Sequence, residues 1–453
     1  MPATAPPTID ALHARYEAGE SPLAILDEIE AAIAALDDPG IFLARPDAES
    51  MRATARALPA FDPARFPLWG VPFAVKDNID VAGLPTSAAC PAFAYVPERT
   101  APVVERLLAA GALLVGKTNL DQFATGLVGV RTPHPVPRNA FDKTRVPGGS
   151  SSGSAVAVAQ NLCTFSLGTD TAGSGRVPAG LNNLVGLKPT VGALSTRGVV
   201  PACRSLDCVS IFALSIADAR RAFDVARGFD VEDPFSRALS SAPASAITRV
   251  AIPRPEDLHF FGDAAAARAW EAGVARLAAL GVAIVEHDVA PLLDCAKLLY
   301  DGPFVAERRA AIGGFFETHA QAIHPVTRAI VASADRFSAV DAFEGMYALR
   351  RYARVAQALF EEVDALAVPT APLFPTLADL EADPIVPNSR LGTYTNFVNL
   401  LDLAALAVPG PFRADGLPAG TTLVAPAGHD SRLADLGARL FPGVGGVAGE
   451  RLA

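Results

Sequence analysis

Hydrophobic residues along this chain fall into two patterns, one typical of amphipathic helices and the other of buried strands. From Pro22 to Leu36, apolar residues return every three or four positions, which predicts a helix that begins after Ser21 and ends at the turn-forming residues 37–40. A short continuous apolar run predicts a buried strand. Such runs occur at residues 71–75, 112–115, 164–167, 249–252 and 282–286.

The helical and strand patterns alternate along most of the chain. Residues 103–108 have helical spacing and precede Gly111 and a strand-like run, and the same order recurs from 264 to 286. Because alternating elements of this kind pack as a sheet covered by helices, the pattern predicts an α/β fold. The polar stretch 230–243 is the strongest candidate for a break between units, although a surface connection would have the same composition.

Composition narrows the class of protein further. Of 453 residues, 51% are hydrophobic and 19% are charged, and the motif-bearing residues 69–207 contain no polar linker, so we expect a single large domain with a sizeable core. The net charge of −10, without a cluster of Lys and Arg, argues against a nucleic-acid partner. No apolar run reaches the roughly 18 residues of a membrane span, and the N-terminus lacks a signal-peptide pattern.

The cysteines and histidines give no sign of a disulfide framework or a metal site. The five cysteines are odd in number and no pair has the C-x-x-C spacing, which disfavours structural zinc and favours the cytoplasm. No two histidines stand four residues apart, as ligands on one helix face would. We therefore expect neither a metal nor an organic cofactor.

Three segments predict serine chemistry driven by a lysine. Lys76 ends an apolar strand pattern, Ser150 lies in a Gly- and Ser-rich run, and Ser174 lies in the loop 170–176. A serine attacks an amide carbonyl only when a base removes its proton, and lysine replaces histidine in some hydrolases. Lysine, with a pKa of about 10.4, must lose roughly 3 units to act near neutrality, and burial would lower it. Asp77 would oppose that shift, but adjacent strand residues point to opposite faces.

These side chains have distinct expected roles. Ser174 is the expected nucleophile, and Lys76 is the base that later acts as an acid. Gly148 and Gly149 permit a tight turn that places the Ser150 hydroxyl between amine and nucleophile as a proton relay. An oxyanion hole for the tetrahedral intermediate is expected from the backbone N–H groups of Thr171, Ala172 and Gly173.

Each segment has a simpler explanation when taken alone. A Gly- and Ser-rich run is commonly a flexible turn, and a lysine at a strand end is commonly a solvated charge. Residues 111–118 also match the phosphate-binding pattern G-x-x-x-x-G-K-[ST], which makes nucleotide binding the alternative from a different class. That motif needs a strand, a loop and then a helix, whereas this segment reads as helix, glycine and strand. A histidine-dependent triad also stays open, because its members can be distant in sequence.

The order and spacing of the lysine and the two serines resemble the amidase signature family. The flanking residues 168–170 and 186–190 resemble that family as well. The resemblance implies a large mixed sheet sandwiched between helices, a Ser-Ser-Lys triad, and a cis peptide near Ser150. Within the family, the runs similar to allophanate hydrolases are residues 83–90, 117–126, 197–208 and 394–399. This implies hydrolysis of the terminal amide of allophanate, a carboxylated urea, through an acyl-enzyme that releases ammonia.

The same resemblance implies how a substrate carboxylate is held. Tyr300 and Arg308 match the tyrosine and arginine that grip the substrate in allophanate hydrolases, and the backbone near Gly126 is a further candidate. A planar guanidinium suits a carboxylate better than an ammonium does. From the residue pattern alone, Tyr300 and Arg308 would more often be surface residues. The alternatives within the family are a general small-amide amidase and a component of a glutamine amidotransferase.

The resemblance also divides the chain and suggests its partners. It implies an N-terminal helical segment (1–65), an amidase signature catalytic domain (66–440) and a tail (441–453), without the second, C-terminal domain of longer allophanate hydrolases. It implies a cytoplasmic enzyme with a functional link to a urea carboxylase, in the breakdown of urea or of cyanuric acid. A homodimer is compatible with this assignment.

Overall fold

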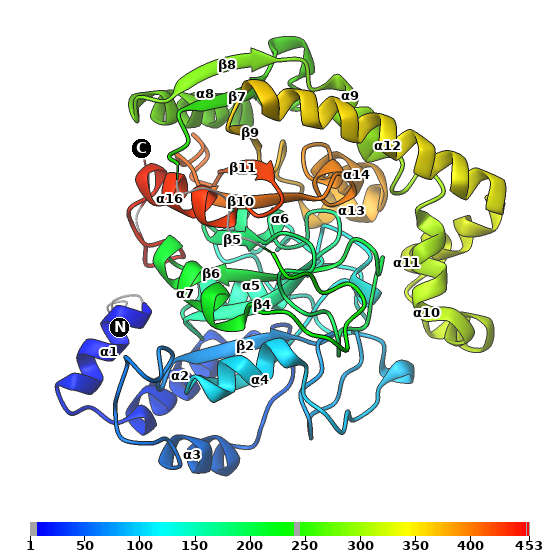
Figure 1. Ribbon diagram of the computed structural model, residues 1–453. Helices are drawn as coiled ribbons and strands as arrows, with labels where there is room; N and C mark the ends of the chain where they lie inside the picture. The colour runs from blue at the N-terminus through cyan, green and yellow to red at the C-terminus, as the bar shows by residue number, and fades with distance from the viewer. Residues whose placement is uncertain (1–6, 240–244, 450, 453) are drawn as a thin grey trace.

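The structure is a computed structural model, and it describes residues 7–239, 245–449 and 451–452. Within these ranges one mixed sheet of eleven strands lies among helices, in the order β1-β3-β2-β4-β6-β5-β10-β11-β9-β7-β8 (Figure 1). The strands are β1 (Phe42–Ala44), β2 (Pro72–Lys76), β3 (Leu113–Thr118), β4 (Phe165–Asp170), β5 (Val185–Lys188), β6 (Cys208–Ala213), β7 (Arg249–Pro253), β8 (Ala283–His287), β9 (Ala365–Pro369), β10 (Leu403–Pro409) and β11 (Gly420–Pro426).

The helices connect the strands and cover the sheet. They are α1 (Ile9–Glu17), α2 (Pro22–Leu36), α3 (Ala48–Arg56), α4 (Pro102–Ala109), α5 (Ser152–Ala159), α6 (Val177–Gly180), α7 (Ile216–Ala226), α8 (Ala264–Ala279), α9 (Ala290–Lys297), α10 (Val305–His319), α11 (Pro325–Ala332), α12 (Ala339–Glu362), α13 (Leu377–Ala382), α14 (Val386–Leu391), α15 (Asn396–Leu400) and α16 (Asp430–Leu440). Short 3-10 turns are η1 (Pro91–Phe93), η2 (Gln122–Ala124), η3 (Pro255–Asp257), η4 (Ala320–Ala322) and η5 (Ser333–Arg336). The α/β fold expected from the sequence is confirmed.

Local sequence signals account for several of these elements. The Ser21 side chain accepts a hydrogen bond from the Leu23 N–H at the start of α2, and the helix ends where Asp37 turns into the left-handed region. The two helix-glycine-strand units form α4–β3 and α8–β8. The candidate break at 230–243 lies partly outside the described residues, and the strands on either side of it, β6 and β7, belong to one sheet. The described part of the stretch is therefore a connection within a single domain.

Strand β2 is central to the position of the site. It runs parallel to both β3 and β4, with Val75 opposite Leu167 in β4. A strand between two parallel neighbours is covered on both faces, and all five residues of β2 are buried. Because parallel strands end at the same edge of a sheet, the loops after β2 and β4 meet there.

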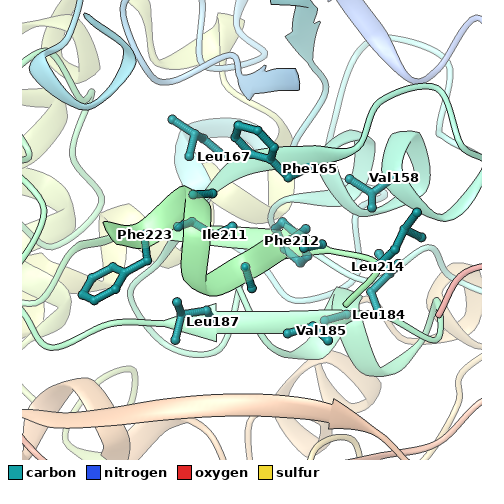
Figure 2. Packing of buried hydrophobic residues seen from close by; sticks show 14 of the residues in the cluster. Val158, Phe165, Leu167, Leu184, Val185, Leu187, Ile211, Phe212, Leu214 and Phe223 are labelled. Carbon is teal, nitrogen blue, oxygen red and sulfur yellow. The ribbon is translucent and has the colours of Figure 1, made fainter. Parts of the chain in front are cut away.

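Apolar side chains pack tightly beneath these loops. Figure 2 shows Phe165 and Leu167 of β4 beside Ile211 and Phe212 of β6. The ring of Phe165 also stacks on Phe73 of β2, with 5.4 Å between the ring centroids. A close-packed interior of this kind resists displacement, so it gives the loops above it a fixed base.

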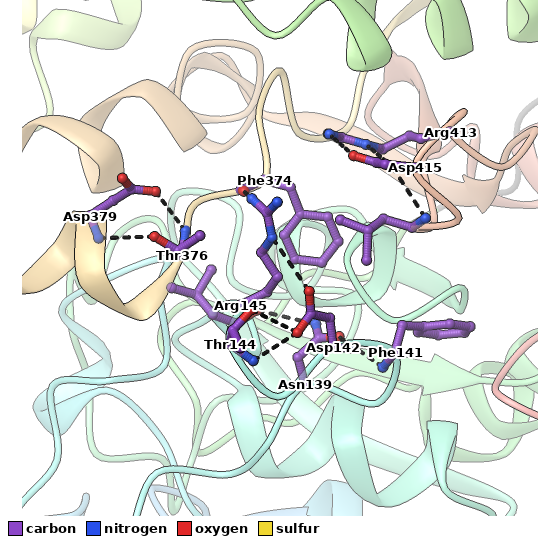
Figure 3. Close-up of polar contacts among 12 residues, drawn as sticks. Asn139, Phe141, Asp142, Thr144, Arg145, Phe374, Thr376, Asp379, Arg413 and Asp415 are labelled. Carbon is purple, nitrogen blue, oxygen red and sulfur yellow. Dashed lines mark hydrogen bonds and ion pairs between the residues drawn. The ribbon is translucent and has the colours of Figure 1, made fainter.

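Polar contacts tie together two segments that are distant in sequence (Figure 3). Asp142 accepts hydrogen bonds from the backbone N–H and the hydroxyl of Thr144, at 2.9 and 2.7 Å. Arg145 donates to the Phe374 carbonyl, and its chain pairs with Thr376 through an isolated bridge. Residues near Asp142 are thereby joined to the start of α13.

Candidate active site

Lys76 is the last residue of β2 and is fully buried. Its Nζ lies 2.7 Å from Ser150 Oγ and 2.8 Å from Thr169 Oγ1. Burial lowers the pKa of Lys76 from 10.5 to about 7, although the negative charges of Asp121 and Asp170 act in the opposite direction. Near neutral pH a large share of this amine is uncharged, which is the state that a general base needs.

The side chain of the neighbouring Asp77 forms an ion pair with Lys117 and not with Lys76. Its carboxylate accepts hydrogen bonds from the backbone and the hydroxyl of Ser87, and lies 3.2 Å from the Nζ of Lys117. Lys117 is inside β3 rather than before a helix, and its ammonium is held in this buried ion pair. The nucleotide-binding alternative for residues 111–118 therefore lacks the geometry that it requires.

Ser150 lies just before α5, after a turn that only glycine can make. The Gly149–Ser150 peptide bond is cis, as the resemblance implied. Gly148 has a φ of 78°, and a side chain on Gly149 would collide with the Asp121 carboxylate. The Gly149 N–H donates to the Leu127 carbonyl at 2.8 Å. This turn directs the Ser150 hydroxyl to the end of β2.

Ser174 lies in the loop between β4 and α6 and is 3% exposed. Its Oγ donates to the Gly126 carbonyl at 3.4 Å. The structure thus joins Lys76 directly to Ser150 and joins Ser174 to Gly126. A direct hydrogen bond between Ser150 and Ser174 is not among the contacts of the described residues.

A buried ion pair fixes the loop that carries Ser174. Arg176 donates two hydrogen bonds of 2.9 Å to the Asp170 carboxylate, and both side chains are fully buried. Burial alone would raise the pKa of Asp170, but the guanidinium beside it holds that pKa below its usual value. At the turn itself, Gly173 has a φ of 146°, and a side chain there would collide with Thr395.

The backbone of this loop presents unoccupied donors. Among the hydrogen bonds of the described residues, none gives an acceptor to the N–H groups of Thr171, Ala172 or Gly173, although all three residues are buried. The Thr171 hydroxyl donates to the buried carboxyl group of Asp207, which fixes the start of the loop. Buried N–H groups are rarely left without an acceptor, so these are suited to a developing oxyanion.

Arg308, on α10, is 2% exposed, so the simpler expectation of a surface residue is wrong for it. It donates to the Tyr300 hydroxyl at 2.8 Å and to the Thr125 hydroxyl at 3.0 Å, while its Nε has no partner. In the described part of the chain no carboxylate lies within 4.0 Å of this guanidinium. Burial raises the pKa of Tyr300, so its hydroxyl stays protonated. Tyr300 lines a cavity of about 560 Å³.

The sequence patterns missed several residues around these groups. Thr169 contacts the amine of Lys76, and Thr125 contacts Arg308. Asp121 accepts from the backbone N–H groups of Gly129 and Arg131, both at 2.9 Å, and so shapes the loop between them. Asp121 and Arg131 are the only charged residues from 118 to 137. Isolated charges in such a run are a usable signal, because charged residues are seldom buried without a specific role.

Three further features of the described residues bear on the site. All five cysteines are buried and unbridged. No group of three or more His, Cys, Asp or Glu side chains that could hold a metal ion occurs in the described ranges. None of the helices in those ranges is both long and apolar enough to cross a membrane.

Known proteins resemble this chain in sequence. A family model described as amidase matches residues 23–434. The chain is 50% identical to the urea amidolyase of Saccharomyces cerevisiae over 382 residues, which is 83% of this chain but only 21% of that protein. It is 34% identical to the 2-amino-5-chloromuconic acid deaminase of Comamonas testosteroni over 376 residues, with 81% of this chain and 80% of that protein covered. The chain therefore spans about a fifth of the length of the first relative and most of the second.

Comparison of the fold with solved structures also finds similarity to an amide hydrolase. The solved structure of Kluyveromyces lactis allophanate hydrolase matches with a TM-score of 0.90 and 44% sequence identity, over 96% of this chain and 72% of that one. The family match includes the segments that carry Lys76, Ser150 and Ser174. Since similarity in sequence and in fold extends over most of its length, the chain belongs to the amidase family.

Proposed function

We propose that this amide hydrolase uses Ser174 as nucleophile, Ser150 as proton relay, and Lys76 as base and acid. The observation that carries the proposal is the contact of a buried amine, whose pKa burial lowers to about 7, with the Ser150 hydroxyl at 2.7 Å. Ser174 lies in the loop that follows β4, at the same edge of the sheet as the end of β2. Its hydrogen bond of 3.4 Å to the Gly126 carbonyl is weak enough to rearrange when a substrate binds.

In the proposed reaction these groups act in the following order. Neutral Lys76 takes the proton of Ser150, which takes the proton of Ser174 as its Oγ attacks the amide carbon. The oxyanion accepts hydrogen bonds from the free N–H groups of residues 171–173. When the C–N bond breaks, the proton returns through Ser150 to the nitrogen, and ammonia leaves. Water then attacks the acyl-enzyme by the same route and frees Ser174.

The proposed substrate is allophanate. Support comes from the similarity to a urea amidolyase and to an allophanate hydrolase, and from Arg308 and Tyr300, which offer an unpaired cation and a hydroxyl donor beside Thr125. A guanidinium that is buried without a carboxylate partner favours binding of a substrate that itself carries a carboxylate. Hydrolysis would release ammonia and N-carboxycarbamate, and the latter would lose carbon dioxide.

An ammonia-release assay with allophanate, urea, malonamate and simple primary amides side by side tests this assignment. We expect allophanate to have the highest kcat/KM, and Ser174→Ala to abolish release of ammonia from every substrate. Arg308→Ala is expected to raise KM for allophanate and malonamate. A preference for uncharged primary amides would instead indicate a general amidase, and an Arg308→Ala variant with unchanged turnover and affinity would refute the carboxylate contact.

We further propose the cellular setting that the similarity suggests. The enzyme would work in the cytoplasm, in urea or cyanuric acid breakdown, on allophanate supplied by a urea carboxylase, and would assemble as a homodimer. The similarity to a urea amidolyase supports the link to urea breakdown. The proposed boundaries of the segments remain 1–65, 66–440 and 441–453.

A further inference from the structure

A second buried guanidinium stands at the same cavity as Tyr300. Arg131 is 2% exposed and lines this cavity. Its Nη1 donates to the Thr125 carbonyl and its Nη2 to the Pro384 carbonyl, both at 3.0 Å. Its Nε has no hydrogen-bond partner. The side chain is thus held in place by two backbone carbonyls, and its Nε is left without a partner.

The charge of Arg131 is not neutralised by an ion pair in the described part of the chain. Asp121 is near, but its carboxylate accepts from the backbone N–H of Arg131 and not from the guanidinium. The Thr125 and Pro384 carbonyls satisfy N–H groups without cancelling the charge. Burial lowers the pKa of Arg131, but a guanidinium remains protonated in proteins. An anion in the cavity would therefore offset a desolvated positive charge.

Arg131 also contacts the backbone at residues 125–126, which Arg308 and Ser174 contact as well. Its Nη1 binds the Thr125 carbonyl, while Arg308 binds the hydroxyl of the same Thr125. The next residue, Gly126, accepts the hydrogen bond from Ser174. One short stretch of backbone thus connects both guanidiniums with the proposed nucleophile. Movement of Arg131 would therefore displace both the proposed carboxylate-binding residue Arg308 and the proposed nucleophile Ser174.

We propose that Arg131 is a specificity-determining residue that acts with Arg308 to select amides carrying a carboxylate on the side away from the scissile bond. Arg308 and the Tyr300 hydroxyl would bind the carboxylate directly. Arg131 would add the second positive charge and hold Thr125 and Gly126 in register with Ser174. This inference rests on the proposed hydrolysis of allophanate and assigns its selectivity to two cations rather than one.

Matched substrates separate charge from shape. Allophanate carries a carboxylate where biuret carries an amide, and malonamate and malonamide differ in the same way. We expect the parent enzyme to prefer the anionic member of each pair. In Arg131→Met, kcat/KM for the anionic members is expected to fall at least about tenfold more than for the neutral members, mainly through KM. Arg131→Lys, which keeps the charge but loses the planar fork, is expected to keep the preference while kcat falls for both.

The control is Arg413→Met, which removes another buried guanidinium. Arg413 is paired with Asp263 and Asp415, at 2.8 and 2.7 Å, and its contact with Asp415 is drawn in Figure 3. This variant is expected to lose stability without a change in substrate preference. An equal loss of kcat/KM for the anionic and neutral members in Arg131→Met would overturn the inference.

Two outcomes keep this inference distinct from the proposed function. A parent enzyme that releases no ammonia from allophanate would refute the proposed function itself. A parent that is active on allophanate, with an unchanged anion preference in Arg131→Met, would refute only the role of Arg131. If Arg131→Met does not fold, Arg131→Gln decides in the same way, because it removes the charge but keeps a polar side chain with an N–H donor.

Discussion

The environment of a single amine determines which chemistry the site can perform. Among the described residues, no carboxylate contacts the Lys76 amine, and its hydrogen-bond partners are the hydroxyls of Ser150 and Thr169. Hydroxyls can accept from an ammonium or donate to a neutral amine, so they permit either protonation state. Desolvation then favours the neutral state, which explains why burial prevails over the more distant aspartates.

The pH dependence of activity follows from this balance. Lys76 is protonated below its pKa of about 7 and neutral above it, so kcat/KM should rise with pH and level off above about 7. Below the midpoint, one required deprotonation gives a tenfold change per pH unit. Steady-state rates with malonamate from pH 5 to 9 test this, since its carboxylate does not titrate there. A profile that is flat across this range, or that falls with rising pH, would contradict a basic role for Lys76.

At the residue scale, the sequence identified the candidates whose neighbours form a pattern. Ser150 and Ser174 stand in glycine-rich runs, and Lys76 ends an apolar strand, so each is marked locally. The role of Arg131 was not predictable in this way, because it depends on the carbonyl of Pro384, which is 253 positions away. A contact of that kind exists only once the chain has folded.

At the scale of elements, the β4–α6 loop depends on the pair formed by Asp170 and Arg176. Both partners are fully buried, so removal of one leaves the other without compensation. We expect Asp170→Asn to lower the free energy of unfolding by about 3 kcal/mol or more and to reduce ammonia release, because it disturbs the residues before Ser174. Urea denaturation followed by circular dichroism measures the first effect.

An exposed ion pair provides the control for this loop. Arg220 and Asp435 lie 2.7 Å apart with side chains that are 47% and 65% exposed. Arg220→Ala is expected to change the free energy of unfolding by no more than about 1 kcal/mol. If both variants had the same small effect, the buried pair would not be what holds the loop.

Elements with a local signal and the mixed sheet between helices were predicted well, whereas the order of the strands in that sheet was not predicted. The helix-glycine-strand units correspond to α4–β3 and α8–β8 within a few residues. Strand β10 was missed because its run Leu403–Pro409 is rich in Ala and Leu, which does not distinguish a strand from a buried helix. The place of β10 between β5 and β11 depends on pairing across more than 200 residues, which no local pattern encodes.

At the scale of the whole molecule, one long helix carries apolar side chains that are exposed in the described part of the chain. Val340, Phe343, Met346 and Tyr347 on α12 are each more than half exposed, and α12 is the long yellow helix in Figure 1. Glu344 precedes Tyr347 and Arg350 follows it by the same number of residues. An antiparallel copy of α12 centred on Tyr347 would therefore set acidic beside basic side chains while covering the aromatic rings.

The proposed homodimer is expected to form through this surface of α12. Sedimentation equilibrium should give a mass near twice the 46.9 kDa of one chain. The double variant Phe343→Glu and Tyr347→Glu should sediment as one chain and still release ammonia, since neither residue is part of the candidate site. A parent protein with the mass of one chain, or a double variant that still dimerises, would contradict this assembly.

Direct titration of the Lys76 amine by NMR tests the central claim, that a buried lysine neutral near physiological pH activates the serine. The chain has five lysines, so selective ¹³C labelling at Cε gives few signals, and Lys76→Met identifies the relevant one. The account predicts a midpoint near pH 7 for that signal. A Lys76 that stays protonated to pH 9 or above would contradict it.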